Sequence, residues 1–199
     1  MHANSYKHMS QFIDRYLKDK VNDKLKILDL GSQDVNGTYK PLFNNSNWQY
    51  TGCDMCSGPN VDIVLKDVYN WKEIESNSID VLVAGQVFEH AEYIWNTIME
   101  ITRVMKEDAV CCIIAPAVWV EHKYPLDCWR IFSDGFRALA KFAGLQVLEA
   151  YTDWGPYGAN MSDSILICKK PILEESEKQK LGEKIKIMKS LADNYEIKI

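Results

Sequence analysis

Two runs of apolar residues constrain the fold of this chain most strongly. The runs IDVLVA (79–84) and VCCIIA (110–115) contain almost no polar residue, so both faces of each segment are apolar. Strands of this kind occur where a parallel sheet is covered by helices on each side. We therefore expect an α/β protein built on a largely parallel sheet.

The remaining elements follow from shorter patterns. We expect seven strands in all, at residues 26–30, 48–53, 61–65, 79–84, 109–115, 145–151 and 164–169. Apolar residues spaced three or four apart predict helices in residues 1–20, after residue 94, after residue 133 and in residues 173–199. Ser5 and Ser133 are expected N-terminal caps, and Gly144 is expected to end the third helix. The alternation predicts a Rossmann-like, doubly wound sheet of seven mostly parallel strands with helices on both faces.

Length and composition indicate one soluble domain. The 199 residues suffice for one core, and no stretch approaches the roughly 18 apolar residues of a membrane-spanning helix. The first 20 residues lack the apolar centre of a signal peptide, so we expect a cytoplasmic protein that does not bind membranes. We expect an N-terminal helix (1–20), a core (26–170) and a C-terminal helix (173–199). That last helix docks on the core or binds a partner, for which a second copy of the chain is a candidate.

Charge and cysteine spacing argue against two classes of partner. The net charge of -5 gives no electrostatic support for binding a nucleic acid. Cys53 and Cys56 have the spacing of a metal or redox pair, but a structural zinc site usually needs a second pair or two matching histidines. We therefore predict reduced cysteines and no metal site.

The segment KILDLGSQDVNG (26–37) predicts a ligand site. Its loop follows the first strand, and in open α/β sheets ligands bind at the carboxyl ends of the strands. A dinucleotide fingerprint needs glycine at positions 31, 33 and 36, but this chain has Gln33 and Asn36. Asp29 would repel a phosphate yet can hold an ammonium group. A nicotinamide-dependent oxidoreductase is therefore a disfavoured alternative.

Two further acids follow the next strands. Asp54 can accept hydrogen bonds from both hydroxyls of a ribose, and Asp67 can accept one from the exocyclic amine of an adenine. Val68 offers an apolar wall beside them. A single acid at a strand end more often caps a loop. Three acids around one glycine loop instead predict a nucleoside with a positively charged amino-acid tail.

At this point the chain resembles the class I S-adenosylmethionine-dependent methyltransferases, of the small bacterial type whose fourth strand ends in a Glu-His pair. The similarity spans residues 26–170 and rests on LDLGSQDVNG, YTGCD, LKDVYNW, IDVLVAGQVFEHA and RVMKEDAVCCIIAP. It implies S-adenosyl-L-methionine as cofactor and S-adenosyl-L-homocysteine as product. The cofactor-binding residues that it implies are Asp29, Gly31, Ser32, Gln33, Gly37, Asp54, Met55, Asp67, Val68, Gly85 and Gln86.

The sequence departs from this family at two turns. The family usually has glycine at the position of Gln33. It often has Lys-Pro-Gly-Gly where this chain has KEDA at residues 106–109.

The methyl acceptor is predicted from the segment 116–132, which is long for a loop and contains several aromatic residues. Its run from His122 to Arg130 resembles that of bacterial methyltransferases associated with surface-polysaccharide or secondary-metabolite biosynthesis. We expect this segment to be a lid on the acceptor side. The acceptor-binding residues predicted here are Trp119, Tyr124, Asp127, Trp129 and Arg130.

A hydroxyl acceptor must also lose its proton. His90 and His122 are the candidate catalytic bases, because the pKa of histidine suits that role. His90 has an alternative role as a helix cap, and His122 as a solvated loop residue. Tyr124 and Trp129 have an alternative role in packing the lid.

The sequence therefore predicts an O-methyltransferase acting on a glycosyl or other small polar hydroxylated acceptor. The alternative is a non-catalytic, methyltransferase-like binding or scaffold module. The apolar stripe of the C-terminal helix keeps that alternative open, because it can bury against a partner.

Overall fold

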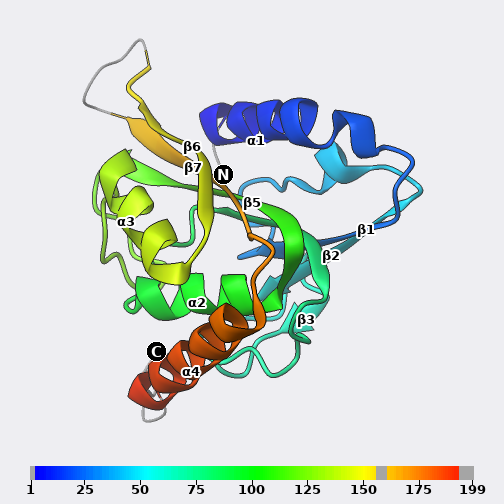
Figure 1. Cartoon of the computed structure of the whole chain (residues 1–199). Coiled ribbons are helices and arrows are strands. Elements are labelled where there is room, and N and C mark those ends of the chain that lie inside the picture. The colour runs from blue at the N-terminus through cyan, green and yellow to red at the C-terminus, as the bar shows by residue number, and fades with distance from the viewer. Residues whose placement is uncertain (1–2, 156–160, 193–199) are drawn as a thin grey trace.

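The computed structural model describes residues 3–155 and 161–192, and these form one seven-stranded sheet in the order β3-β2-β1-β4-β5-β7-β6 (Figure 1). Neighbouring strands are parallel except for β7, which runs antiparallel to both β5 and β6. The predicted Rossmann-like fold class is confirmed. The strands are β1 (Leu25–Leu30), β2 (Trp48–Asp54), β3 (Ile63–Val64), β4 (Ile79–Gly85), β5 (Met105–Val118), β6 (Gln146–Asp153) and β7 (Ser162–Lys169).

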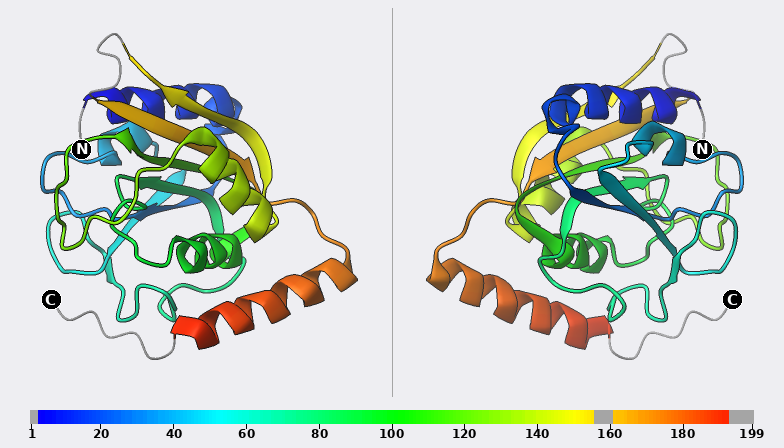
Figure 2. Two further views of the ribbon diagram at one scale, coloured as in Figure 1. Left: turned by 90° about the vertical axis from the view of Figure 1, so that its left-hand side faces the viewer. Right: turned by 90° about the vertical axis from the view of Figure 1, so that its right-hand side faces the viewer.

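Helices cover the two faces of the sheet unequally. The helices are α1 (Ala3–Tyr16), α2 (Ile94–Val104), α3 (Ser133–Ala143) and α4 (Glu175–Ala192), with short 3₁₀ turns at Lys18–Lys20 and Lys40–Phe43. Helix α1 lies on one face, whereas α2 and α3 lie on the other and α4 runs beside α2 (Figures 1 and 2). Phe12 of α1 and Phe136 of α3 accordingly belong to two separate apolar clusters.

The helix ends show where local sequence signals were misleading. Ser5 lies inside α1, and its hydroxyl makes a buried hydrogen bond with the hydroxyl of Tyr39. Ser133 is the first residue of α3, so Phe132 takes the cap position without a side-chain bond. Both predicted caps are therefore wrong. The prediction for Gly144 is confirmed, because its φ of +73° is the left-handed conformation that ends a helix.

The turn before the main part of β5 explains one departure from the family pattern. Asp108 has a φ of +69°, and its N–H donates to the carbonyl of Lys170 at 2.9 Å. Aspartate tolerates this left-handed conformation better than most residues. The chain thus keeps the turn although the sequence has KEDA where glycines are common.

Helix α4 packs against α2. Docking on the core was one of the two roles that the sequence left open for this helix. The side-chain amide of Asn96 in α2 donates to the carbonyl of Met188 at 2.7 Å, and Lys189 pairs with Glu100 at 3.3 Å. Ile187 and Leu191 on the same helix are mostly exposed. Residues 193–199 of the predicted helix lie outside the described residues.

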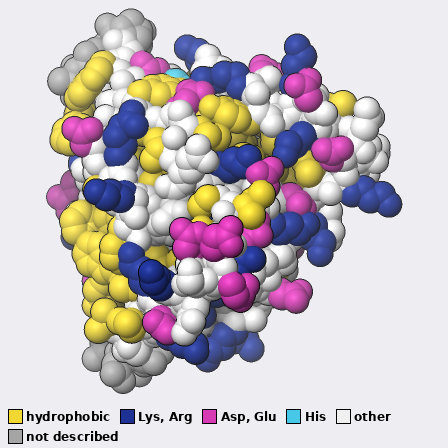
Figure 3. Space-filling model, in the orientation of Figure 1, with side chains coloured by type: hydrophobic (Ala, Val, Ile, Leu, Met, Phe, Trp, Pro, Cys, Tyr) yellow, Lys and Arg dark blue, Asp and Glu magenta, His cyan; other side chains and the backbone are white. Residues whose placement is uncertain are grey.

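The surface carries charges of both signs. On the face shown in Figure 3, acidic and basic side chains are interspersed, and apolar side chains gather along one edge. Among the described residues, no helix combines the length and apolar composition needed to cross a membrane.

Candidate functional site

A cavity of about 690 Å³ opens at the carboxyl ends of β1, β2 and β4. This is the end of a parallel sheet where ligands bind, and the volume lies in the usual range for small-molecule sites. The cavity brings together most of the predicted site residues from both the cofactor and the acceptor groups. Those that line it are Asp29, Gly31, Ser32, Gln33, Gly37, Asp54, Met55, Val68, Gly85, Gln86, His90, Trp119, His122 and Tyr124.

Asp29 is a buried carboxylate on the cavity wall. Its side chain is 3% exposed and accepts a hydrogen bond from the hydroxyl of Tyr50 on β2. Burial raises the pKa of Asp29 to about 7, with a further rise from the charge of Asp54 and an opposing effect from the Tyr50 hydrogen bond. A bound ammonium group would offset the cost of charging this carboxylate.

The loop after β1 is fixed by its backbone. Gly31 has a φ of +73°, and the N–H groups of Gly31 and Ser32 both donate to the carbonyl of Cys53, at 2.8 and 3.1 Å. Asn60 closes the loop from the other side, because it accepts from the Ser32 hydroxyl at 2.8 Å and donates to the Ser32 carbonyl at 3.0 Å. A Cβ atom at Gly31 would overlap the side chain of Val87. Glycine is therefore required here by both conformation and space.

Asp54 stands at the end of β2 with its carboxylate held in place. One oxygen accepts from the N–H of Gln33 at 3.1 Å, and the other accepts from the N–H of Cys56 at 3.3 Å. A carboxylate oxygen has capacity for further bonds, so both oxygens can still accept from a ligand hydroxyl. The backbone of Gln33 thus keeps a position beside Asp54, although the residue is not the expected glycine.

Asp67 does not line the cavity, which differs from the prediction. Its carboxylate accepts from the N–H of Tyr69 at 2.8 Å and so caps the turn after β3. This is the local role that aspartate often plays in turns. The neighbouring side chains do reach the cavity, and the apolar wall consists of Leu65, Val68, Tyr69 and Trp71.

The acceptor side is formed by the acceptor loop, residues 119–132 between β5 and α3. Trp119, His122 and Tyr124 of this loop line the cavity, and His90 lines it from the turn after β4. The ring centroids of His90 and His122 lie 5.0 Å apart. The two histidines, 32 positions apart in sequence, thus meet at one end of the cavity.

Three predicted acceptor residues instead support the acceptor loop and do not line the cavity. Asp127 accepts from the N–H of His122 at 2.6 Å and pairs with Arg130 at 2.6 Å. The Arg130 guanidinium holds the pKa of Asp127 well below its usual range. The indole N–H of Trp129 donates to the carbonyl of Ala91 at 2.8 Å. These contacts fix the shape of the loop, and the acceptor-binding roles of Asp127, Trp129 and Arg130 stay predictions.

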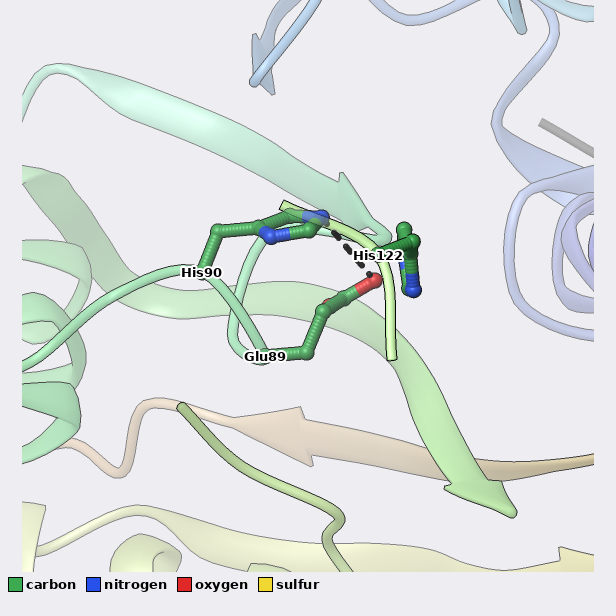
Figure 4. Close-up of side chains that lie close together, drawn as sticks. All are labelled: Glu89, His90 and His122. Atoms are coloured by element: carbon green, nitrogen blue, oxygen red, sulfur yellow. Dashed lines mark ion pairs between the residues drawn. The ribbon is translucent and has the colours of Figure 1, made fainter. Parts of the chain in front are cut away.

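Glu89 is a residue that the sequence reasoning left out of the site. Its side chain is completely buried and neither carboxylate oxygen accepts a hydrogen bond, while His90 Nε2 lies 3.6 Å from one of them (Figure 4). Burial raises the pKa of Glu89 to about 8 and lowers that of His90. Its backbone carbonyl accepts from the N–H groups of Cys128 and Trp129, at 2.6 and 3.1 Å. The Glu-His pair after the fourth strand was the available signal, but only the fold shows the carboxylate unpartnered.

Comparison with known families confirms the resemblance found in the sequence. Residues 28–113 match the family model Methyltransf_11, described as a methyltransferase domain. The matched segment and the shared fold support a class I S-adenosylmethionine-dependent methyltransferase. The methyltransferase match covers β1 to most of β5, which are the elements that carry the cavity's cofactor side. No curated protein sequence matches the chain.

Solved structures share the fold at low sequence identity. A 1,6-didemethyltoxoflavin-N1-methyltransferase from Burkholderia thailandensis, with S-adenosylhomocysteine bound, is 13% identical with a TM-score of 0.63, covering 84% of this chain and 79% of that one. A SAM-dependent methyltransferase from Aquifex aeolicus is 14% identical with a TM-score of 0.54, covering 84% and 98%. The cyclase SpnF is 16% identical with a TM-score of 0.58, covering 82% of each chain. At such identities the likeness shows the fold of this methyltransferase alone.

Proposed function

We propose that this S-adenosylmethionine-dependent methyltransferase transfers a methyl group to a hydroxyl of a small polar acceptor, such as a glycosyl compound. One observation carries the proposal. The acids of the cofactor side and the histidines of the acceptor side line the same cavity. A cofactor held by Asp29 and Asp54 therefore shares one enclosed space with an acceptor held beside His90 and His122.

The cavity's carboxylates and apolar walls fit S-adenosyl-L-methionine. The buried carboxylate of Asp29 suits an ammonium group, and that of Asp54 suits the ribose hydroxyls. The apolar side chains of Leu65, Val68 and Trp71 offer flat contact to an adenine ring. Asp67 does not line the cavity. We infer that backbone groups near Asp67, and not its carboxylate, form hydrogen bonds with the adenine edge.

The remaining residues would prepare the acceptor. The cofactor supplies an electrophilic methyl group on a sulfonium centre. The chain must then place a nucleophile in line with that group and keep water away. Trp119 and Tyr124 enclose the acceptor end, and His90, His122 and Glu89 provide basic groups for removing a hydroxyl proton.

The basic cluster favours oxygen over nitrogen as the methylated atom. A neutral amine already has a free electron pair, whereas an alcohol is a poor nucleophile until its proton is taken. A buried carboxylate beside two imidazoles is therefore more useful for a hydroxyl acceptor. The toxoflavin enzyme, an N-methyltransferase by name, shows that the shared fold permits the other outcome.

Calorimetric titration with S-adenosyl-L-methionine and S-adenosyl-L-homocysteine, with NAD as control, tests the cofactor. We expect binding of the first two and none of NAD. A screen of sugars and other small alcohols, read by formation of S-adenosyl-L-homocysteine, then tests the acceptor class. Turnover with amines alone would contradict O-methylation. Binding of the cofactor without turnover across the screen would favour the non-catalytic scaffold module.

A further inference from the structure

We propose that Glu89, His90 and His122 bind one divalent transition-metal cation, Zn²⁺ before others, at the acceptor end of the cavity. One ligand atom from each of the three side chains lies within 4.8 Å of the other two. The three converge from the turn after β4 and from the acceptor loop (Figure 4). Their convergence requires the fold, since Glu89 and His122 are 33 positions apart.

The unpartnered carboxylate of Glu89 is the strongest observation in favour of a bound cation. Its side chain is completely buried, yet neither carboxylate oxygen accepts a hydrogen bond. Burying a carboxylate without compensation is costly, so such groups are normally paired, hydrogen-bonded or coordinated to a metal. The nearby guanidinium of Arg130 is already committed to Asp127. A cation beside Glu89 would supply the compensation.

The histidine hydrogen bonds leave one nitrogen of each ring for a metal. His90 Nδ1 lies 2.5 Å from the carbonyl of Leu126, and His122 Nδ1 lies 3.1 Å from the carbonyl of Val120. A carbonyl only accepts, so in both rings Nδ1 carries the proton. Nε2 of each neutral imidazole is then left with its electron pair. Metal-binding histidines are oriented by a partner in this way.

The spacing of the cluster is close to that of a metal site. With metal–nitrogen and metal–oxygen bonds of about 2.0–2.2 Å, two ligands of one tetrahedral ion lie roughly 3.4 Å apart. His90 Nε2 and Glu89 Oε1 are already 3.6 Å apart. The side chain of His122 is partly exposed, so small rotations of its ring can bring in the third ligand.

The kinds of ligand select the kind of ion. Two imidazoles and one carboxylate are a common set in catalytic zinc sites, which keep a further position for water or substrate. Mg²⁺ and Ca²⁺ prefer sites made of oxygen ligands. His90 and His122 line the same cavity as the acceptor loop aromatics Trp119 and Tyr124, so a ligand in the cavity could reach the ion.

The role of the ion rests on the proposed O-methyl transfer. A cation at this site would bind the acceptor hydroxyl and lower its pKa, as bound zinc does for water. The hydroxyl proton passes to solvent, the oxygen forms a bond to the methyl carbon, and the carbon–sulfur bond breaks with its electrons remaining on sulfur. His90 and His122 then act as ligands, and neither has to serve as the base.

Direct metal titration tests the site without any knowledge of the acceptor. The purified chain is treated with EDTA, dialysed, and titrated with Zn²⁺ by calorimetry and with Co²⁺ by visible absorption. We expect one equivalent of each metal to bind, with Zn²⁺ in the micromolar range or tighter. We expect Glu89→Gln and His122→Ala each to weaken Zn²⁺ binding by at least about ten-fold.

His8→Gln is the matched control, because His8 also forms a histidine–carboxylate pair, with Asp153 at 2.8 Å, outside the cavity. Its Zn²⁺ affinity should equal that of the unaltered chain. Circular dichroism checks that each variant folds, and the partly exposed position of His122 keeps its variant informative if Glu89→Gln is unstable. Absence of Zn²⁺ binding, or equal affinity in folded His122→Ala, overturns the proposal.

The same samples are titrated with S-adenosyl-L-homocysteine. Cofactor binding without Zn²⁺ binding overturns the metal site and leaves the proposed function standing, with Glu89 as the candidate base. Zn²⁺ binding without cofactor binding supports the site and contradicts the proposed function.

Discussion

The two sides of the cavity differ in how their polar groups are satisfied. On the cofactor side, Asp29 and Asp54 already accept hydrogen bonds from Tyr50, Gln33 and Cys56. On the acceptor side, Glu89 is completely buried with no hydrogen bond to either oxygen. The carboxylates of the cofactor side are thus hydrogen-bonded before a ligand arrives, whereas the buried carboxylate of the acceptor side has no hydrogen-bond partner.

This difference teaches how the two ligands are bound. A preformed site loses little conformational entropy on binding, which suits a cofactor that every catalytic cycle must recruit. The acceptor side takes much of its lining from one long loop, which is the usual location of residues that determine specificity. Changes on the two sides should therefore have separable effects.

The largest effect is expected where the cofactor side depends on backbone conformation. Gly31→Ala should lower the free energy of unfolding by about 2–5 kcal/mol, because left-handed strain and overlap with Val87 add together. Affinity for S-adenosyl-L-homocysteine should fall as well. Urea unfolding and calorimetry measure the two effects.

Gly144→Ala is the matched control, because its φ is also +73° and no atom lies within 4 Å of an added Cβ. It should cost only the strain of about 1–2 kcal/mol and leave cofactor affinity unchanged. Equal losses in the two variants would show that the contact with Val87 is unimportant.

A smaller effect on stability is expected on the acceptor side. Asp127→Ala removes the partner of Arg130 and the acceptor for the His122 N–H, so unfolding free energy should fall by about 1–3 kcal/mol. Affinity for S-adenosyl-L-homocysteine should not change. Glu121→Ala, which breaks only an exposed pair with Lys123, should be neutral. A large loss of cofactor affinity in Asp127→Ala would show that the two sides are coupled.

Asp54→Ala tests what a side chain contributes to cofactor binding. It should weaken binding of S-adenosyl-L-homocysteine by about ten-fold or more, equivalent to about 1.4 kcal/mol. Asp80→Ala is a suitable control, because Asp80 pairs with Lys106 outside the cavity. Unchanged affinity in Asp54→Ala would remove this residue from the ribose site.

The smallest effect is a pH dependence from Asp29. Its pKa is raised to about 7 on folding, so its neutral form stabilises the unliganded protein. That contribution is complete below the ordinary pKa near 4 and is lost as pH rises through about 7. We propose that the ammonium group of the cofactor pairs with the charged form, so affinity should rise between pH 6 and pH 8, by at most about ten-fold.

Calorimetry at the two pH values measures this rise, and Asp29→Asn supplies the comparison because it cannot titrate. The asparagine variant should bind more weakly at pH 8 and lose this part of the pH dependence. An equal rise in both proteins would assign the titration to another group.

Much of the fold can be predicted from the sequence because apolar strand segments and the glycine loop are recognised from residues that are adjacent in the chain. The runs at 79–84 and 110–115 predict buried strands, and Asp29 and Gly31 are predicted to lie at their carboxyl edge. Segment ends are less predictable. The Ser5 hydroxyl bonds to the distant Tyr39, and this contact is invisible to a rule about helix caps.

The site shows the same division between local and distant information. Asp54 lines the cavity, whereas Asp67, with the same local pattern, accepts a hydrogen bond within its own turn. Asp127 and Arg130 pair with each other, and neither lines the cavity. Glu89 was missed because its lack of a partner is a property of the packed interior. No single-sequence pattern reports that property.

The attachment of the acceptor loop has a consequence for how such enzymes diversify. The loop is fastened at few points, chiefly the Glu89 carbonyl, the Ala91 carbonyl and the Asp127–Arg130 pair. Exposed side chains of the loop, such as Val120 and Tyr124, can change without disturbing the sheet or the glycine loop. A new acceptor can therefore be accommodated by substitutions within one contiguous stretch of the gene, while the cofactor machinery is inherited unchanged.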